Sequence, residues 1–217
     1  METSRSGMSM NKTIHCAIRR DLARFRQALE SFADGDKGRA ADLHRAWQNF
    51  DEQLTSHHEG EHDIAWPALH AMGVADSTIQ TFDVEHEAMA TDLAAARGAM
   101  SRLKSSATRA DADVTLAAME RLQETTVTHL DHEEAEIEDE LTQRADHPAM
   151  KEMGRQFSRR SGPATSGTFF AWMQDGATPE EKSALRAHVP AAVLVLLGGP
   201  FGRRYRKEVA SVWTRTA

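Results

Sequence analysis

Apolar residues recur at intervals of three and four along four long stretches of the sequence, which predicts four amphipathic helices. The expected helices span residues 9–33, 39–70, 76–104 and 111–144. The most regular stripe belongs to the third helix and consists of Ile79, Phe82, His86, Met89, Leu93, Ala96, Met100 and Leu103. Pro67 lies inside the second stretch and should kink or end that helix. Four such helices with short connections predict an all-α, up-down-up-down four-helix bundle.

The pattern changes after residue 146, where the periodic stretches become shorter and Gly, Pro and Arg become more frequent. We therefore expect a disordered N-terminus over residues 1–9, the bundle over 10–146 and a small C-terminal helical extension over 147–217. Within the extension, short helices are expected around 163–176, directly after Thr178, and near the end of the chain.

An apolar run over residues 189–197 is followed closely by four basic side chains, a combination that also occurs in anchors lying on a membrane surface. The run is too short to span a bilayer, which takes about 20 residues. A packed core segment of the extension is the favoured interpretation, together with the alternative that the extension forms a homodimer contact.

Composition narrows the classes of function. The chain has 33 acidic against 26 basic residues and a net charge of −7, which argues against a nucleic-acid partner. A single cysteine, Cys16, excludes an internal disulfide and fits a reducing compartment. The first residues lack the apolar core of a signal peptide, and no stretch is long enough for a membrane span. These features predict a cytoplasmic protein.

Histidines and carboxylates occupy positions on the helix stripes that would otherwise belong to the core. The second helix carries His57 and Glu61 four residues apart on one face, and the fourth helix repeats this spacing. An isolated carboxylate in a bundle core costs several kcal/mol unless it is paired or bound to a cation. The candidate metal ligands are His15, His57, Glu61, His86, His129 and Glu133.

Counting residues from each turn places these six side chains at a similar depth, so they can converge. Four imidazoles and two bridging carboxylates suit two ions of a metal such as iron. Two six-coordinate ions with an oxo or hydroxo bridge would keep about two of their twelve positions for water or a small ligand. We therefore predict an open di-iron site, with a four-ligand structural zinc site as the weaker alternative. The adjacent histidines His58, His62 and His132 are expected to flank the site or face solvent, and Glu134 is expected to belong to a solvated acidic face.

With these residues in view, the sequence resembles the hemerythrin-like, or HHE cation-binding, family over residues 10–145. The matching motifs are His15, the string from His57-His58 through Glu61-His62 to Trp66-Pro67, the pair Glu85-His86, and His129-Leu-Asp-His132-Glu133-Glu134. The resemblance implies a non-haem di-iron bundle that handles dioxygen, peroxide, nitric oxide or labile iron. It also implies that the six candidates are the ligands, with Glu61 and Glu133 as bridges.

The chain departs from the oxygen-carrying members of that family. Their third helix has a second histidine where this chain has Ala90, and their fourth helix has an aspartate where Glu133 is the nearest match. The ligand set is similar to that of the family's iron–sulfur repair proteins, without their cysteine-bearing N-terminal segment.

Reversible oxygen carriage is therefore not expected. The expected function is reaction with dioxygen, peroxide or nitric oxide during oxidative stress. Whether this includes catalase- or peroxidase-like turnover stays open. The alternative is a non-catalytic oxygen or redox sensor or an iron-handling protein.

Overall fold

The computed structural model describes residues 7–214, which contain helices and no strand, so the all-α prediction is confirmed. The four long helices are α1 (Met10–Glu30), α2 (Lys37–Gly60), α4 (Asp76–Ser106) and α5 (Arg109–Gln143). Residues 1–6, the larger part of the segment expected to be disordered, lie outside the described residues. Ser9 already belongs to the fold, because its side chain accepts the backbone N–H of Lys12 and caps α1.

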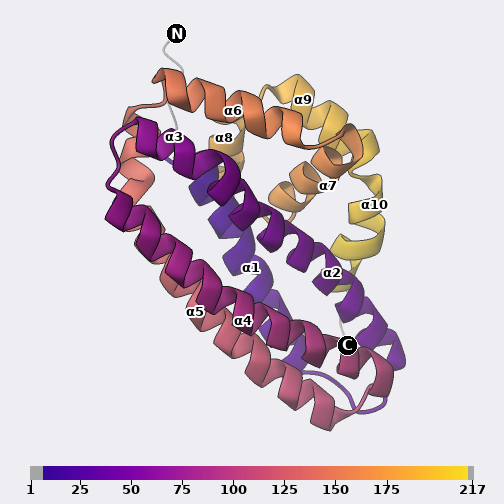
Figure 1. Cartoon of the computed structure of the whole chain (residues 1–217). Coiled ribbons are helices and arrows are strands. Elements are labelled where there is room, and N and C mark those ends of the chain that lie inside the picture. Colours follow the sequence, from indigo (N-terminus) through magenta and orange to yellow (C-terminus); the bar gives the residue numbers. More distant parts are fainter. Residues whose placement is uncertain (1–6, 215–217) are drawn as a thin grey trace.

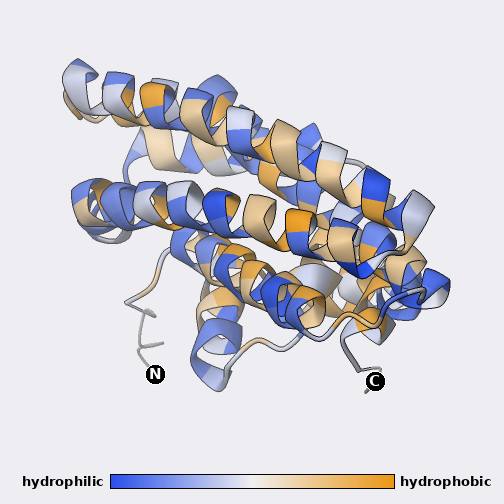
Figure 2. Ribbon diagram, turned by 90° about the horizontal axis from the view of Figure 1, so that it is seen from below, coloured by the Kyte–Doolittle hydropathy of each residue, from blue (hydrophilic) through white to orange (hydrophobic). Residues whose placement is uncertain are grey.

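The four long helices contact one another in a ring, in which α4 packs along α5, α5 against α1, α1 against α2 and α2 against α4 (Figure 1). Apolar residues recur along the ribbon of each helix, between hydrophilic positions (Figure 2). The predicted stripe of α4 is buried from Phe82 to Leu103 apart from His86, which is partly buried. This contact pattern is the one expected of an up-down-up-down arrangement.

The second predicted helix is interrupted near Pro67. After Gly60 the chain makes a π-helical turn, η1 (Glu61–Ala65), and then continues as α3 (Trp66–Ala71). Pro67 has no N–H to donate to the carbonyl four residues earlier, and a π-helical turn accommodates such a missing bond. The backbone stays in the right-handed helical region at Gly60, Ala65 and Trp66, so the path remains helical while its hydrogen bonding changes.

The C-terminal extension is a chain of short helices that lies beside α1 and α2 (Figure 1). Its elements are α6 (Pro148–Arg160), α7 (Pro163–Gln174), α8 (Pro179–His188), α9 (Ala191–Leu196), η2 (Leu197–Phe201), α10 (Arg203–Tyr205), η3 (Arg206–Ala210) and α11 (Ser211–Thr214). The helices expected around 163–176 and after Thr178 are present, whereas α6 was not predicted. None of the side chains of α6 is fully buried, although Met150, Met153 and Phe157 recur at intervals of three and four and Pro148 at its first turn is a recognisable start signal.

A polar network joins the extension to α1. The carboxylate of Asp21 is buried and accepts the indole N–H of Trp172 at 2.8 Å. Arg24 donates to both Asp21 and Asp175, at 3.1 and 2.9 Å, and Tyr205 donates to Asp175 at 3.0 Å. Side chains from the bundle and from the extension belong to one continuous apolar core, which contains both Phe25 and Trp172. The extension therefore shares the core of the bundle.

The apolar run at 189–197 is only partly packed. Leu194 is buried, but Val195 is 73% and Leu196 59% exposed, so the expectation of a packed core segment is wrong for this side of α9. No single helix among residues 7–214 is long and apolar enough to cross a membrane. Among the described residues, one pair of consecutive segments, α8 and Ala191–Phe201, reaches the required length and hydropathy when the two are taken together. The chain bends by 112° between them.

Candidate metal centre

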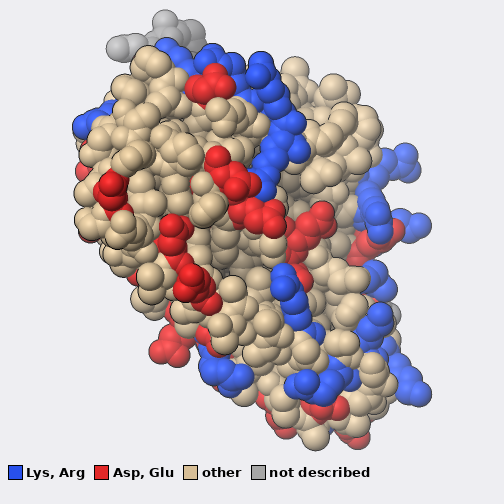
Figure 3. Space-filling view, in the orientation of Figure 1, with Lys and Arg blue, Asp and Glu red and all other residues tan. Residues whose placement is uncertain are grey.

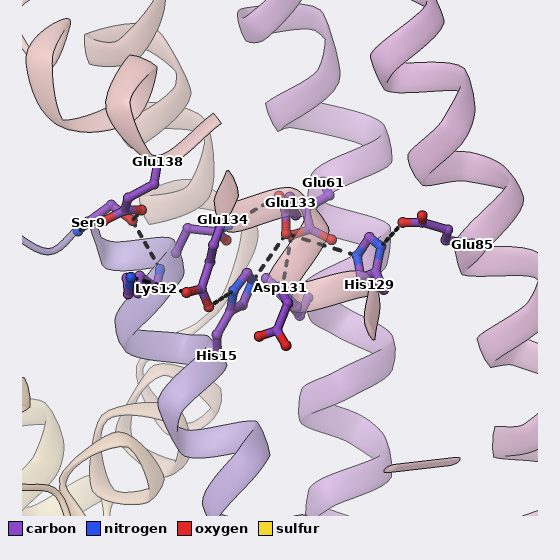
Figure 4. A network of polar contacts seen from close by, with 12 residues as sticks. Ser9, Lys12, His15, Glu61, Glu85, His129, Asp131, Glu133, Glu134 and Glu138 are labelled. Carbon is purple, nitrogen blue, oxygen red and sulfur yellow. Dashed lines mark hydrogen bonds and ion pairs between the residues drawn. The ribbon is translucent and has the colours of Figure 1, made fainter. Parts of the chain in front are cut away.

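The six predicted ligands come together between the four long helices. His15 lies on α1, His57 near the end of α2, Glu61 at the start of η1 and His86 on α4; His129 and Glu133 lie on α5. Two groups of four have donor atoms within 4.8 Å of one another, and Glu61 belongs to both. The first group is His15, His57, Glu61 and Glu133, and the second is His58, Glu61, His86 and His129. Figure 4 shows Glu133 lying between the imidazoles of His15 and His129.

His58 lies closer to the centre than the sequence predicted. It was expected to flank the site or face solvent, but its Nε2 atom is buried in the second group. The reason is its spacing from Glu61. At about 100° per residue, a residue three positions earlier lies about 60° from Glu61 around the helix, and His57, four positions earlier, lies about 40° away on the other side. Both imidazoles therefore reach the carboxylate between them. His58 also stacks on His86, with ring centroids 4.3 Å apart.

The buried donor atoms of the centre have no partners within the protein, which is the test of whether these residues fit a metal. Nε2 of His15, His57 and His58, both carboxylate oxygens of Glu61, and Oε2 of Glu133 are buried without a hydrogen bond. Nε2 of His57 faces Oε1 of Glu61 at 3.0 Å without hydrogen-bond geometry. Buried polar atoms are otherwise satisfied in proteins, so this concentration indicates a cation site.

The spacing of the nitrogens also fits a metal. Nε2 of His86 and Nε2 of His129 are 3.0 Å apart. Two ligand nitrogens bound at right angles at about 2.1 Å would be separated by about 3 Å. This distance fits two nitrogens bound to one metal ion, and each of the two donor groups could hold an ion.

The two carboxylates of the centre differ in their surroundings. Oε1 of Glu61 faces His57 and its Oε2 faces His86, at 3.0 and 3.4 Å, so this side chain spans both groups. Glu133 instead accepts the amide of Asn11 through Oε1 at 3.1 Å. Its other oxygen faces His15 at 3.2 Å and His129 at 3.9 Å. Asn11 therefore leaves Glu133 a single oxygen for the centre.

Outer carboxylates orient two of the imidazoles. Glu134 lies 3.0 Å from Nδ1 of His15, and Glu85 lies 2.9 Å from Nδ1 of His129. A neutral imidazole that donates its Nδ1 proton to a carboxylate presents the lone pair of Nε2 to a metal. Glu134 was expected to belong to a solvated acidic face, but it also pairs with Lys12 and Arg19, and its pKa is about 2, since the bonds from His15 and Arg19 outweigh the effect of burial.

Sequence reasoning missed the role of Glu85. Its carboxylate joins His129 to His132, whose Nδ1 lies 2.8 Å from Oε1. The only signal in the sequence is that Glu85 directly precedes a stripe histidine. His132 is 35% exposed and stands outside both donor groups, and His62 is 70% exposed beside Asp63. Both therefore behave as the sequence predicted.

Burial sets the protonation of the centre. It lowers the pKa of His57 and of His58 well below the usual value, with help from neighbouring imidazoles. Burial together with His129 lowers the pKa of His86 to about 4. Burial and the nearby Glu133 raise the pKa of Glu61, whereas at Glu133 the interaction with His15, 3.2 Å away, outweighs burial and lowers the pKa. Most of the imidazoles are therefore neutral at pH 7, which is the form that binds metals.

A family model described as the hemerythrin HHE cation-binding domain matches residues 8–141 of the chain. No curated protein and no solved structure matched the chain.

Proposed function

Because the chain belongs to the hemerythrin HHE cation-binding family, we propose that it is a non-haem di-iron protein that binds dioxygen, peroxide or nitric oxide inside a four-helix bundle. The observation that carries this proposal is the set of buried donor atoms without partners, contributed by α1, α2, η1 and α5 and completed by His86 on α4. The cofactor we propose is a pair of iron ions joined by an oxo or hydroxo bridge.

The residues divide unevenly between the two ions. His15 and His57 would hold one, His58, His86 and His129 the other, while Glu61 spans both and Glu133 contributes Oε2. When bound, iron supplies a Lewis acid and a change of oxidation state for a small oxygen or nitrogen ligand. Trp66 and Phe82 lie against His86 and His129 and limit access of water on that side.

The outer residues hold protons at defined atoms. Glu134 and Glu85 keep the Nδ1 protons of His15 and His129, so that the Nε2 atoms stay free for the metals. Asn11 donates to Glu133 and fixes which oxygen points inward. None of these groups needs to change protonation when iron enters.

His58 and Glu133 together set the expected number of open positions. Five imidazoles, two oxygens of Glu61, one oxygen of Glu133 and two positions of the bridge would fill about ten of the twelve positions of two octahedral ions, so about two would stay open. His58 thus replaces, from the second helix, the histidine that Ala90 removes from the third. The sequence argument against reversible oxygen binding assumed two imidazoles for each ion, whereas these groups hold three and two, so a non-catalytic oxygen or redox sensor is the second candidate.

One experiment tests the proposal and separates the two candidates. The protein is expressed in iron-replete medium, its metals are measured, and it is reduced anaerobically, exposed to dioxygen and then purged with inert gas while the spectrum is recorded. We expect two iron ions per chain and charge-transfer absorption in the oxidised form. Full return to the reduced spectrum over repeated cycles would support the sensor, and consumption of peroxide would support the reactive protein. A single metal ion per chain, or zinc alone, would refute the di-iron proposal.

A further inference from the structure

The exposed apolar side chains of the molecule are concentrated on the extension. Seven large hydrophobic side chains are exposed in the described part of the chain, and four of them lie within residues 193–201. These four, which we call the α9 face, are Val193, Val195, Leu196 and Phe201, exposed by 36%, 73%, 59% and 43%. Such clustering marks a contact surface, since exposed apolar residues are otherwise scattered.

Charge is segregated around the same face. Residues 182–207 contain six Lys and Arg side chains and no Asp or Glu, whereas the remainder of the chain has 33 acidic against 20 basic residues. Arg203, Arg204 and Lys207 follow Phe201 directly and are exposed. Lys and Arg side chains project along the edge of the molecule where α10 lies (Figures 1 and 3). The apolar face therefore lies within a positively charged part of an acidic protein.

The two features also meet in space. A hollow of about 1010 Å³ beside α9 is lined by Arg186 and Arg206, by one acidic residue, Asp175, and by apolar side chains that include Leu194 and Val195. The guanidinium of Arg206 donates to the carbonyls of Gly198 and Gly199, which fixes this cation beside η2. Cationic and apolar groups thus line one hollow at the base of the α9 face.

From this combination we infer that the α9 face docks on the surface of a bilayer that contains anionic lipids. Such a surface accepts apolar side chains at the level of the acyl chains and neutralises basic side chains at the headgroups, at about 1 kcal/mol for each Lys or Arg. A second copy of this chain, joined through the same face, would bring together two segments that stay net positive, although Glu208, directly after each segment, pairs with Arg204 at 2.9 Å. The inference is independent of the metal centre.

The test is co-sedimentation of the full-length protein with vesicles. Phosphatidylcholine vesicles with added phosphatidylglycerol should bind the protein, and this binding should weaken as salt is added. Vesicles of phosphatidylcholine alone should bind it at least tenfold more weakly. Val195→Ser combined with Leu196→Ser, and separately Arg203→Gln combined with Arg204→Gln, should each weaken binding about tenfold or more. All four side chains are exposed, so the folded bundle and its metal content should stay unchanged.

Matched variants elsewhere on the surface serve as controls. Val114→Ser removes another half-exposed valine, on α5, and Arg121→Gln removes another exposed arginine; both should bind vesicles like the unaltered protein. Absence of vesicle binding, equal binding to the two kinds of vesicle, or equal losses in the control variants would overturn the proposal. Self-association that Val195→Ser and Leu196→Ser abolish, without vesicle binding, would instead assign the face to a second copy.

Discussion

Glu61 lies between two imidazoles of its own helical segment, and this local arrangement determines the asymmetry of the whole centre. His57 reaches it from four residues before and His58 from three. Because the carboxylate has one oxygen near His57 and the other near His86, it joins the two donor groups. Three imidazoles consequently belong to one group and two to the other, although each long helix contributes to the same buried cluster.

The first prediction concerns His58. Replacing it by Ala removes a buried donor, so iron affinity should fall by at least the 10–100-fold seen when outer-layer partners of metal ligands are lost. His62→Ala is the matched control, since it removes an adjacent histidine whose side chain is 70% exposed. Iron titrations of the two variants make the comparison. Equal iron content and affinity for both would place His58 outside the centre.

The sequence predicted the six stripe residues of the centre because burial of a carboxylate on a helix stripe demands a partner. It did not predict His58, because this residue lies about 100° around the helix from His57 and therefore off the stripe, although it lies only about 60° from Glu61. The roles of Asn11 and Glu85 could not be predicted either, since they depend on contacts between residues of different helices that are 44 or more positions apart in the sequence. Periodicity along one helix holds no information about such contacts.

The second prediction concerns pH and the metal-free protein. The pKa values of His57, His58, His86 and His129 are lowered by folding, so the unfolded chain binds more protons below its ordinary pKa of about 6.5. Their contribution to stability is therefore lost as pH falls from about 6.5 toward 4. For His86 alone, the loss between pH 7 and pH 5 is roughly 2 kcal/mol.

Three groups act in the opposite direction, because folding raises the pKa values of His15, Asp21 and Glu61. The four lowered imidazoles outnumber them, so urea unfolding should show a less stable metal-free protein at pH 5 than at pH 7. His58→Leu removes one of the four and should lose less stability over the same interval. A wild-type protein that is equally stable at both pH values would contradict the buried neutral imidazoles.

At the scale of elements, the sequence predicted those helices that bury a regular stripe and missed those held by irregular contacts. Helices α1, α4 and α5 lie within a few residues of their expected bounds, whereas α2 ends at Gly60 and the rest of its expected span continues as η1 and α3. Ser9, Asp36 and Thr108 cap the starts of α1, α2 and α5. The π-helical turn η1 was not predicted, because its hydrogen-bond spacing differs from that of the α-helix and leaves no mark on a 3.6-residue apolar period. In the extension, α7 and η2 approach each other closely at Gly167, a backbone contact that an apolar period does not reveal.

The third prediction tests this glycine packing. A Cβ atom on Gly167 of α7 would lie 2.8 Å from the backbone carbonyl oxygen of Leu197 and from the backbone of Phe201, neither of which can move like a side chain. Gly167→Ala should therefore destabilise the protein by about 1–3 kcal/mol. Gly199→Ala, in η2 itself, has open space around its Cβ position and is the matched control. The midpoint temperatures of thermal unfolding of the two variants are compared. Equal midpoint temperatures would mean that α7 and η2 are not tightly packed.

At the scale of the whole molecule, bundle and extension form one apolar core. Trp172, Leu185, Tyr205 and Val212 are buried in the same cluster as the core side chains of α1 and α2. Sequence periodicity separated residues 10–146 from 147–217, and the family match ends at residue 141, yet packing continues across that boundary. The extension covers an apolar side of the bundle that would otherwise be in contact with water.

The last prediction follows from this shared core. A chain that ends at residue 146 would expose the side of α1 that carries Phe25 and the buried carboxylate of Asp21, so it should unfold at a much lower temperature or aggregate. Trp172→Phe tests the same contact within the full-length chain, since it keeps most of the ring but removes the N–H that donates to Asp21. Leaving that buried carboxylate without this donor should cost about 1–3 kcal/mol of stability. Trp66→Phe is the matched variant within the bundle, where the lost partner, Asp83, is only partly buried, and its cost should be smaller. A truncated protein as stable as the full chain would show that the bundle needs no extension and would assign residues 147–217 to a separate task.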